Sequence, residues 1–459
     1  MAKVGIPKGT RDFGPQEMMK RNYLFQTIKS SFEHYGFLPI ETPAMETTQT
    51  LLGKYGEEGD RLIFKIMPRG EKVKKLINGV ISLAQKTTHE NINPKIIESS
   101  AEEALRYDLT VPFARFVVQH QNDLSFPFKR YQIQPVWRAD RPQKGRYREF
   151  YQCDVDVIGS NSLFNEVELV QMIDEVFSNL QLPDVVIKLN NRKVLTGLAQ
   201  VVGAEDHIID ITVAIDKLDK IGLSKVNDEM IQKGVSQDAV DALQPLLKIS
   251  GSSAEKLDTL EKMFAGNEVG QKGVEELRFI LDTTIELDIR NVEIDITLAR
   301  GLNYYTGAIF EVQHPDFPSS ICGGGRYDDL TGIFGLKDLS GVGISFGADR
   351  IYDLLKDKNL FPETASRSTD VLFVNFGETE ARYCLSLIKA LRLAGIRSEL
   401  FPDAAKMKKQ MKYANDNKVS YVAMVGSQEM ESNQIAVKEM KTGNQETLNL
   451  VQLIEKLKS

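Results

Sequence analysis

Two alternating runs of apolar and polar side chains constrain the fold of this chain more than any other feature of its sequence. Residues 129–138 and 146–158 both alternate at every second position, which is the pattern of strands with two different faces. The connecting residues 139–145 include Pro142 and Gly145, which favour a loop. We therefore predict an antiparallel hairpin with a long, basic loop, inside a block that is antiparallel in texture with helices packed outside.

Polar side chains gather on one face of each predicted strand. For either strand alone, a solvated face is the ordinary explanation. Two adjacent strands that carry Arg, Gln and Asp on a possible common face favour a polar ligand cavity instead. Arg138 would face an anion there, and Gln152 and Asp156 would face an ammonium group or a ring nitrogen. Because alternate residues share a face, the two polar sets are Arg130, Gln132, Gln134 and Arg138 in the first run, and Arg148, Phe150, Gln152, Asp154 and Asp156 in the second.

A second polar segment, residues 106–115, allows two interpretations. Asp108 and Thr110 would share one face of a strand, and a carboxylate and a hydroxyl together can bind an α-amino group through charge-assisted hydrogen bonds. Alternatively, the segment is the end of a strand with an N-cap for a helix that starts after Pro112. The residues alone leave both interpretations open.

An arginine and two tyrosines follow the strand-like run 292–298. Arg300 keeps its charge and presents five donors in a rigid fork, which suits a phosphate or a carboxylate. Tyr304 and Tyr305 offer flat apolar faces with a hydroxyl at the rim, which suit a small ring. The ordinary alternative is a β-hairpin with an exposed arginine. The neighbouring polar segments favour a pocket wall.

Glycines mark two further segments. Alternating glycines in residues 341–347 let backbone or ligand approach closely, and this strand is predicted to enter a helix near Arg350, where the helix start favours anions. Residues 323–328 are predicted to form a turn that runs into a helix. The sequence has neither a P-loop nor a dinucleotide-binding fingerprint, so arginines and metal ions would have to hold any bound ATP.

Composition limits the kind of protein. The 459 residues suggest about three domains, and 42% hydrophobic and 26% charged residues are ordinary for a globular chain. The net charge is −7, yet residues 369–459 hold 13 Lys and Arg against 11 Asp and Glu, which permits a local polyanion contact. Three distant cysteines indicate neither a zinc site nor a disulfide framework. Without a leader-like segment or an apolar run of roughly 18 residues, we predict a cytoplasmic protein with no membrane span.

The motifs together resemble those of the class II aminoacyl-tRNA synthetases and, within that class, the histidyl-tRNA synthetases, over essentially the full length. Pro43 after residues 36–42, the 129–158 hairpin and residues 343–350 resemble the three motifs of the class, the first of which builds the dimer interface. Residues 300–307 and 323–328 resemble the two histidine-specific motifs. Asn303 stands where the family usually has Asp, and we expect no consequence because neighbouring side chains bind the ligand.

The resemblance implies an α+β catalytic domain on an antiparallel sheet flanked by helices, a helical insertion and a C-terminal α/β anticodon-binding domain. We expect the catalytic core at residues 1–190 and 286–360, the insertion at 191–285, a linker at 361–368 and the anticodon-binding domain at 369–459. The implied activity is ATP-dependent attachment of L-histidine to tRNA(His) through a histidyl-adenylate, with release of AMP and diphosphate. A cytoplasmic homodimer is implied as well, with Mg²⁺ held mainly through ATP and no metal site made of Cys or His.

Site roles follow from the same resemblance, position by position. Arg138 and Arg300 are expected to be catalytic at the α-phosphate of ATP, with Arg300 also beside the histidine carboxylate. Arg350 is expected at the γ-phosphate. The expected histidine-binding residues are Asp108, Thr110, Gln152 and Asp156 at the amino group, Tyr304 and Tyr305 at the imidazole, and Leu109 between the first two.

Two rival assignments use the same fold. A histidine-sensing regulatory subunit of ATP phosphoribosyltransferase would bind histidine but could discard the ATP arginines and the C-terminal domain, which this chain retains. A class II synthetase for another amino acid is disfavoured by the tyrosine pair.

Overall fold

The structure is a computed structural model that describes residues 4–86, 101–299 and 304–458. It divides into two compact units, which are described separately. Unit 1 comprises Met1–Arg11 and Leu24–Leu360, and unit 2 comprises Asp12–Tyr23 and Phe361–Ser459. Helix α1 (Pro15–His34) contributes residues to both units. Among the described helices, none has the length and apolar character needed to cross a membrane.

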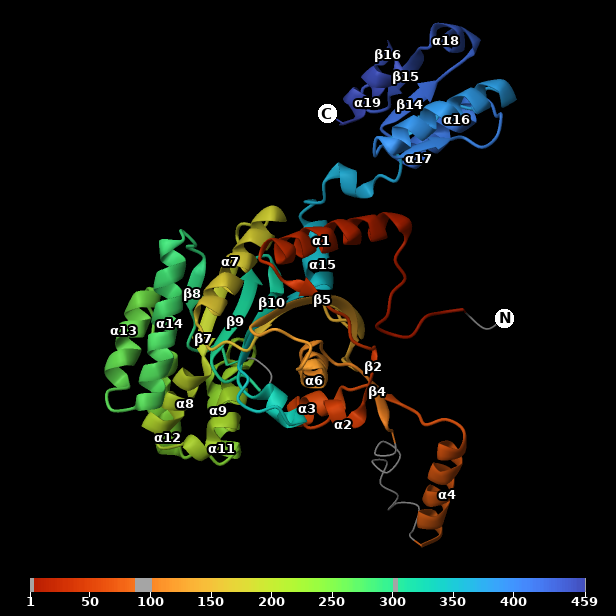
Figure 1. Cartoon of the computed structure of the whole chain (residues 1–459). Coiled ribbons are helices and arrows are strands. Elements are labelled where there is room, and N and C mark those ends of the chain that lie inside the picture. Colours follow the sequence, from red (N-terminus) through yellow and green to blue (C-terminus); the bar gives the residue numbers. More distant parts are fainter. Residues whose placement is uncertain (1–3, 87–100, 300–303, 459) are drawn as a thin grey trace. The chain divides into compact units, whose positions relative to one another are not determined.

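An eight-stranded sheet forms the centre of unit 1 (Figure 1). The pairs from β5 to β7 are antiparallel, and the two edge pairs, β1 with β5 and β7 with β8, are parallel. The antiparallel core that the sequence predicts is therefore confirmed. In sheet order the strands are β1 (Leu38–Pro39), β5 (Phe128–Trp137), β6 (Glu149–Ile158), β11 (Gly341–Gly347), β10 (Phe317–Tyr327), β9 (Ala308–His314), β7 (Val186–Asn191) and β8 (Val292–Ile294).

The two faces of this sheet differ in chemistry. In β11 the apolar side chains point to the helices: the ring of Phe346 lies 5.8 Å from the ring of Phe32 in α1 and 5.8 Å from that of Phe177 in α7 (Phe164–Asn179). The alternate positions of β11 are glycines and Ser345, so that the opposite face is small and polar. Alternation thus separates a buried core from a candidate ligand face.

The predicted hairpin is present as β5 and β6, and their register tests the predicted common face. Arg130 lies opposite Asp156, Gln132 opposite Asp154 and Gln134 opposite Gln152. Directly opposite residues project to the same side of a sheet. The polar side chains of the two strands therefore share one face, as predicted. This face is not solvated: Arg130, Gln132 and Asp156 are all buried.

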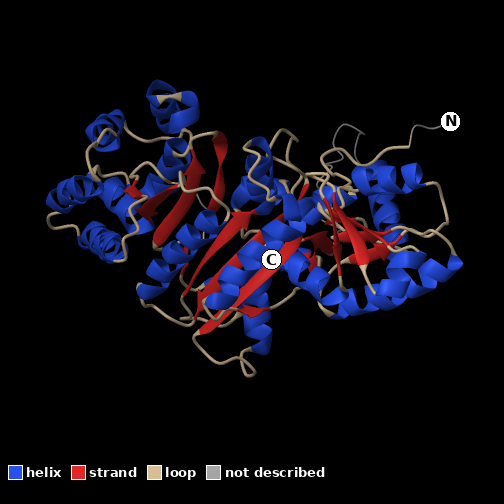
Figure 2. Cartoon of the chain, turned by 90° about the horizontal axis from the view of Figure 1, so that it is seen from above, coloured by secondary structure: helices blue, strands red, loops and turns tan. Residues whose placement is uncertain are grey.

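A helical segment follows β7, as the composition of residues 191–285 predicts, and helices flank the large sheet (Figure 2). Whether this segment is a separate domain stays a prediction, because it belongs to unit 1. Its elements are α8 (Arg192–Val201), η2 (Glu205–His207), α9 (Ile208–Ile215), α10 (Leu218–Ile221), α11 (Leu223–Gln232), α12 (Gln237–Leu247), α13 (Ser253–Met263) and α14 (Glu268–Glu286).

A small three-stranded sheet and short helices complete unit 1. The small sheet has the order β2 (Met45–Thr47), β4 (Glu103–Leu105) and β3 (Lys65–Ile66). The remaining elements are α2 (Thr48–Leu51), α3 (Gly56–Arg61), α4 (Glu71–Lys86), α6 (Thr110–His120), η3 (Leu330–Phe334) and α15 (Ala348–Asp357).

Two sequence predictions about secondary structure are wrong. Asp108 and Thr110 do not share a strand face, because β4 ends at Leu105 and Thr110 is the first residue of α6. The backbone N–H of Val111 donates to Oδ1 of Asp108 at 3.2 Å, so the aspartate satisfies a donor at the helix start. The alternative of a helix start is the one found, although the helix begins two residues before Pro112.

Residues 323–327 are the second correction, since they lie in strand β10 and not in a turn. Gly324 is buried in the middle of the sheet, and a Cβ atom there would lie 2.0 Å from the carbonyl oxygen of Gly343. The glycine therefore permits a close approach between neighbouring strands. Glycine favours turns and close backbone approach alike, which is why the sequence pattern was misleading.

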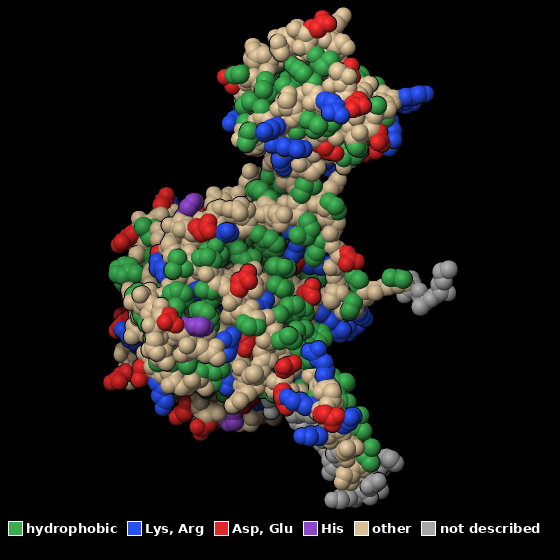
Figure 3. Space-filling model, turned by 45° about the vertical axis from the view of Figure 1, so that its right-hand side comes forward, with side chains coloured by type: hydrophobic (Ala, Val, Ile, Leu, Met, Phe, Trp, Pro, Cys, Tyr) green, Lys and Arg blue, Asp and Glu red, His purple; other side chains and the backbone are tan. Residues whose placement is uncertain are grey.

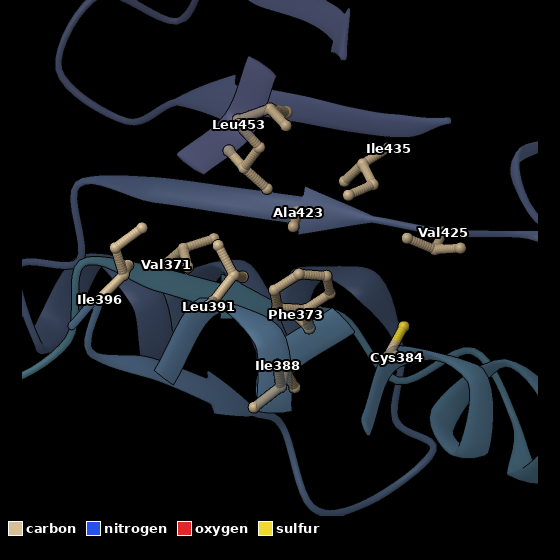
Figure 4. Packing of buried hydrophobic residues seen from close by; sticks show 11 residues of the cluster. Val371, Phe373, Cys384, Ile388, Leu391, Ile396, Ala423, Val425, Ile435 and Leu453 are labelled. Atoms are coloured by element: carbon tan, nitrogen blue, oxygen red, sulfur yellow. The ribbon is translucent and has the colours of Figure 1, made fainter. Parts of the chain in front are cut away.

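Unit 2 is a small α/β arrangement, as predicted, around a five-stranded sheet. Strand β12 alternates its burial, with Val371 and Phe373 packed in one cluster and Leu372 in another (Figure 4). The sheet order is β13 (Ser398–Leu400), β12 (Val371–Phe373), β14 (Tyr421–Met424), β15 (Ile435–Glu439) and β16 (Gln445–Leu448), and the helices are η4 (Glu363–Ser366), α16 (Glu378–Leu393), α17 (Met407–Asp416), α18 (Ser427–Ser432) and α19 (Leu450–Lys458). Strand β16 and helix α18 were not predicted.

Candidate active site

A cavity of about 170 Å³ opens on the polar face of the large sheet of unit 1. Its walls come from the β5–β6 loop, from β6, β10 and β11, and from the start of α15. Arg138, Gln152 and Arg350 line it, together with Cys322 and Ser345. Three residues that the sequence analysis assigned to ligand binding thus meet at one cavity, although they come from distant parts of the chain.

Arg138 lies directly after β5 and is held in a fixed plane. Its Nε donates to the backbone carbonyl of Tyr107 at 3.1 Å. Its guanidinium carbon lies 4.2 Å from the ring centroid of Tyr107 and 5.2 Å from that of Phe150. Cation–π contacts of this kind orient the guanidinium without neutralising its charge. The cavity wall therefore contains a preoriented cation.

Arg350 is the third residue of α15 and joins two walls of the cavity. Its Nε donates to the carbonyl of Gly145 at 3.0 Å, and its Nη1 donates to the carbonyl of Ser320 at 2.7 Å. The adjacent Asp349 is buried, accepts from the backbone N–H of Tyr151 at 2.8 Å and forms an ion pair with Arg11. These contacts fix the helix start, where the backbone N–H groups also favour an anion.

Asp108 is a buried carboxylate with several donors. The hydroxyl of Tyr55 donates to its Oδ1 at 2.9 Å, and the hydroxyl of Tyr304 donates to its Oδ2 at 3.3 Å. Burial raises the pKa of Asp108, and the hydrogen bonds oppose that shift. Arg138 also acts on it, because this cation favours the ionised carboxylate. Asp108 therefore belongs to the same electrostatic environment as the cavity.

Leu109 and Thr110 follow Asp108 at the start of α6. Leu109 is buried, and its backbone carbonyl accepts from Nη2 of Arg130 at 3.5 Å. Thr110 hydrogen-bonds to the hydroxyl of Tyr304. Thr110 therefore lies close to Asp108 by way of the helix start and not by strand alternation.

The tyrosine pair packs beside this carboxylate. The rings of Tyr304 and Tyr305 are edge-to-face with centroids 5.0 Å apart, and Tyr304 is edge-to-face with Tyr327 at 6.1 Å. Burial raises the pKa of both Tyr304 and Tyr305 far above the ordinary value, so both hydroxyls stay protonated. A Cβ atom at Gly325 would lie 3.0 Å from the Tyr305 ring, so glycine at this position leaves room for the aromatic wall.

Asp156 is partnered on both oxygens. It forms a buried ion pair with Arg130, with 2.6 Å between Nη2 and Oδ2, and the hydroxyl of Tyr327 donates to its Oδ1 at 2.7 Å. Burial raises its pKa, while Arg130 lowers it. Because a carboxylate has about four lone-pair sites, these partners do not exhaust its capacity to accept.

Gln152, in contrast, has an unused acceptor. Its Nε2 donates to Oγ of Ser345 at 2.7 Å, whereas its Oε1 is buried and has no hydrogen-bond partner among the described residues. A buried acceptor without a partner costs about 1–3 kcal/mol, so its presence in a ligand cavity indicates that a ligand supplies the donor.

Sequence analysis missed four residues of this site: Tyr55, Arg130, Asp154 and Tyr327. Tyr55 and Tyr327 give no local signal, because their partners are far away in sequence. Arg130 and Asp154 were placed on the polar face, and only their burial shows that they belong to the site. Arg300, which was assigned a catalytic role, lies outside the described residues, so its position stays a prediction.

The fold and the site together define a class of protein. An antiparallel sheet with helices outside carries one arginine at the end of a hairpin strand and a second arginine at the helix that follows a glycine-rich strand. This is the arrangement of a class II aminoacyl-tRNA synthetase. A separate C-terminal unit with its own sheet accompanies it.

Comparison with known proteins identifies the family. The family model described as histidyl-tRNA synthetase matches residues 84–351, and the model described as anticodon binding domain matches residues 370–459. The chain belongs to the histidyl-tRNA synthetase family.

Similar proteins match along the whole chain. A protein of Phocaeicola vulgatus named histidine–tRNA ligase is 57% identical and covers 100% of both chains. A protein of the same name from Christiangramia forsetii is 56% identical over 97% of both chains. Among solved structures, that of histidyl-tRNA synthetase from Nostoc sp. PCC 7120 has a TM-score of 0.83 at 30% identity, over 100% of this chain and 99% of that one.

Proposed function

We propose that this chain is a histidine–tRNA ligase, which activates L-histidine with ATP and transfers it to tRNA(His). The observation that carries the proposal is one cavity lined by Arg138, Gln152 and Arg350, with the Asp108 carboxylate in the field of Arg138. Such a site offers cations to phosphates and acceptors to an ammonium group at neighbouring positions. Amino acid activation needs both, because the reaction joins two anions.

The histidine site is proposed around Asp108 and the tyrosine pair. Asp108, Thr110, Gln152 and Asp156 hold the amino group, and Leu109 shapes the helix start between the first two. The buried carboxylates and the unpartnered Oε1 of Gln152 support this assignment, since an ammonium group donates up to three hydrogen bonds. Tyr304 and Tyr305 line the imidazole, which their edge-to-face rings would accept as a third ring.

The ATP site is proposed at the arginines. Arg138 contacts the α-phosphate, Arg350 contacts the γ-phosphate, and Arg300 lies beside the α-phosphate and the histidine carboxylate. Fixed guanidinium groups suit this role because they bind phosphate oxygens with defined geometry and cannot lose their charge. Asp140 and Asp349 are the carboxylates in the cavity lining, and Asp349 is already engaged by Arg11. Mg²⁺ is therefore proposed to enter with ATP, held mainly by phosphate oxygens, where it would neutralise their charge.

The reaction follows in two steps. An oxygen of the histidine carboxylate attacks the α-phosphorus, the bond from that phosphorus to the bridging oxygen breaks, and diphosphate leaves. A ribose hydroxyl at the tRNA end then attacks the carbonyl carbon of the adenylate, and AMP leaves. The chain's residues align the reactants and neutralise charge, and no side-chain nucleophile is required. Losing Arg138 should therefore slow activation by about 10²–10³-fold.

Unit 2 is proposed to contact the tRNA anticodon, in keeping with the family model that matches it. Lys406, Lys408, Lys409 and Lys412 are exposed on and before α17. On the face drawn in Figure 3, basic and acidic side chains are interspersed, so charge alone does not mark a tRNA surface on that face. Lysines would supply salt-sensitive affinity, while base contacts would supply specificity.

A homodimer in the cytoplasm is proposed as the working form. Leu38 and Met45, in the segment that resembles the dimer-forming motif, expose 57% and 51% of their surface within one chain. Apolar side chains at strand edges of this kind are typical of protein interfaces.

The test is ATP–diphosphate exchange measured with each of the twenty amino acids in turn. We expect exchange with L-histidine only. A histidine-sensing subunit would bind histidine without catalysing exchange, and a synthetase for another amino acid would exchange with that amino acid. Either result would contradict the proposal.

A further inference from the structure

A chain of hydrogen bonds runs behind the candidate amino-group site. Nε2 of Gln152 donates to Oγ of Ser345 at 2.7 Å, and Ser345 hydrogen-bonds in turn to the carboxylate of Asp154. Ser345 and Asp154 lie directly opposite each other on β11 and β6. Ser345 is therefore placed between an amide and a carboxylate by the register of two central strands.

The direction of this chain is fixed by its last member. An ionised carboxylate can only accept, and a hydroxyl has a single proton to donate. When Ser345 donates its proton to Asp154, its oxygen must accept from the neighbouring group, so the amide of Gln152 turns its NH₂ toward Ser345. The other end of the amide, the buried and unpartnered Oε1, then faces away from Ser345.

We propose that Asp154 and Ser345 are positioning residues that orient the amide of Gln152, so that its carbonyl oxygen accepts a hydrogen bond from the amino group of the substrate. The proposal rests on the proposed function, because histidine supplies that amino group. Asp154 acts through Ser345 and Gln152, and it does not contact the substrate. Without the carboxylate, the amide would be free to turn its NH₂ toward the ammonium group, where two donors would face each other.

The surroundings of Asp154 show why such a device is needed at this place. Asp154 is 2% exposed, and burial raises its pKa to about 7. Arg130 on β5 favours its charge, whereas Asp156 on the same strand and Asp108 before α6 oppose it. A third buried carboxylate beside two others destabilises the folded protein, and groups of this kind cluster at functional sites.

The test compares two ligands in two variants of the full chain, Asp154→Asn and Ser345→Ala. The ligands are L-histidine and imidazolepropionate, which is histidine without its amino group, and their affinities are measured by calorimetry and by inhibition of exchange. We expect about 10- to 100-fold weaker binding of histidine, since a hydrogen bond to a charged group is lost, and unchanged binding of imidazolepropionate and of ATP. The double variant should be no weaker than Ser345→Ala alone, because both substitutions act through Gln152.

Glu276→Gln is the matched control. Glu276 is also a buried acid that accepts from a side-chain amide, that of Asn191 at 2.8 Å, and its substitution should leave histidine binding unchanged. Unchanged histidine affinity in both variants would overturn the proposal. Equal weakening of both ligands would overturn it too, because that result indicates general damage to the pocket. Failure of the proposed function is a separate result, in which the unmodified chain shows no exchange with histidine.

Discussion

The hydroxyl of Tyr304 donates to Oδ2 of Asp108 at 3.3 Å, which joins two residues 196 positions apart in sequence. A tyrosine from one motif thereby contacts a carboxylate from another, and both are assigned to the same ligand. The contact places the proposed imidazole wall next to the proposed amino-group acceptor.

Asp108→Asn should weaken histidine use while leaving ATP use unchanged. The substitution keeps the shape of the side chain and removes the charge that pairs with the ammonium group. We expect the KM for histidine in diphosphate exchange to rise by about 10- to 100-fold, the value of one charge-assisted hydrogen bond. Tyr55→Phe, which removes one donor but leaves the carboxylate, is the matched control and should have a smaller effect. A Tyr55→Phe effect as large as that of Asp108→Asn would contradict the assignment.

Arg350→Ala should act on ATP and not on histidine. The guanidinium donates to two backbone carbonyls and is proposed to meet the γ-phosphate as well. We expect the KM for ATP to rise by about 10- to 100-fold at unchanged KM for histidine. Arg350→Lys should not restore activity, because an ammonium group cannot reproduce a fork that spans two carbonyls. Full activity of the lysine variant would argue against a geometric role.

The raised pKa of Asp154, about 7, predicts how stability depends on pH. In the unfolded chain an aspartate loses its proton near pH 4, so between about pH 4 and pH 7 the folded chain binds the extra proton. Stability contributed by this site therefore falls as pH rises through that window, by up to about 4 kcal/mol. Asp154→Asn should be more stable than the unmodified chain at pH 8 and no more stable near pH 4. Denaturant unfolding at the two pH values measures this, and an equal stability difference at both would contradict the shift.

The homodimer is tested by sedimentation. We expect a dimer at micromolar concentration, and we expect Met45→Glu to shift it toward monomer, since a charge would be buried without a partner. Met45 is half exposed within one chain, so the substitution should not unfold the monomer. An active monomer of the unmodified chain would contradict this part of the proposal.

Lys408 and Lys412 test the role of unit 2. Both are exposed on α17, and Lys412 has only an ion pair with Asp416 at 2.7 Å, which is of little value at the surface. We expect the double substitution to alanine to weaken tRNA binding and to reduce its salt dependence, by about 0.7 in the log–log slope for each lost phosphate contact on a single strand. Diphosphate exchange should be unaffected. Charging that is unchanged at every salt concentration would remove these lysines from the interface.

The sequence predicted those parts of the site that depend on local periodicity. The common face of β5 and β6 follows from strict alternation, because the register of two hairpin strands leaves few choices. The burial alternation of residues 292–298 was likewise visible, with Val292, Ile294, Ile296 and Leu298 all buried. In unit 2, alternation between polar helical stretches and short apolar strands indicated the α/β arrangement.

The sequence could not predict parts that depend on distant partners. Asp108 was placed on a strand because alternation is short-ranged evidence, whereas its cap-like bond to Val111 and its bond to Tyr55 belong to the folded chain. Arg326 looked like part of a ligand motif, yet it forms a buried ion pair with Glu166, 160 positions away. Burial of Arg130 and Asp154 depends on which elements cover the polar face, and no local pattern encodes that.

The most direct test of the account is a single-turnover transfer experiment with the unmodified chain. The chain is incubated with labelled histidine, ATP and Mg²⁺, freed of small molecules, and then mixed with tRNA(His). The account predicts that labelled histidyl-adenylate stays bound through the first step and that its label passes to the tRNA, with one AMP formed for each histidine transferred. Histidine that binds without forming an adenylate, or an adenylate that never passes its label to tRNA(His), would contradict it.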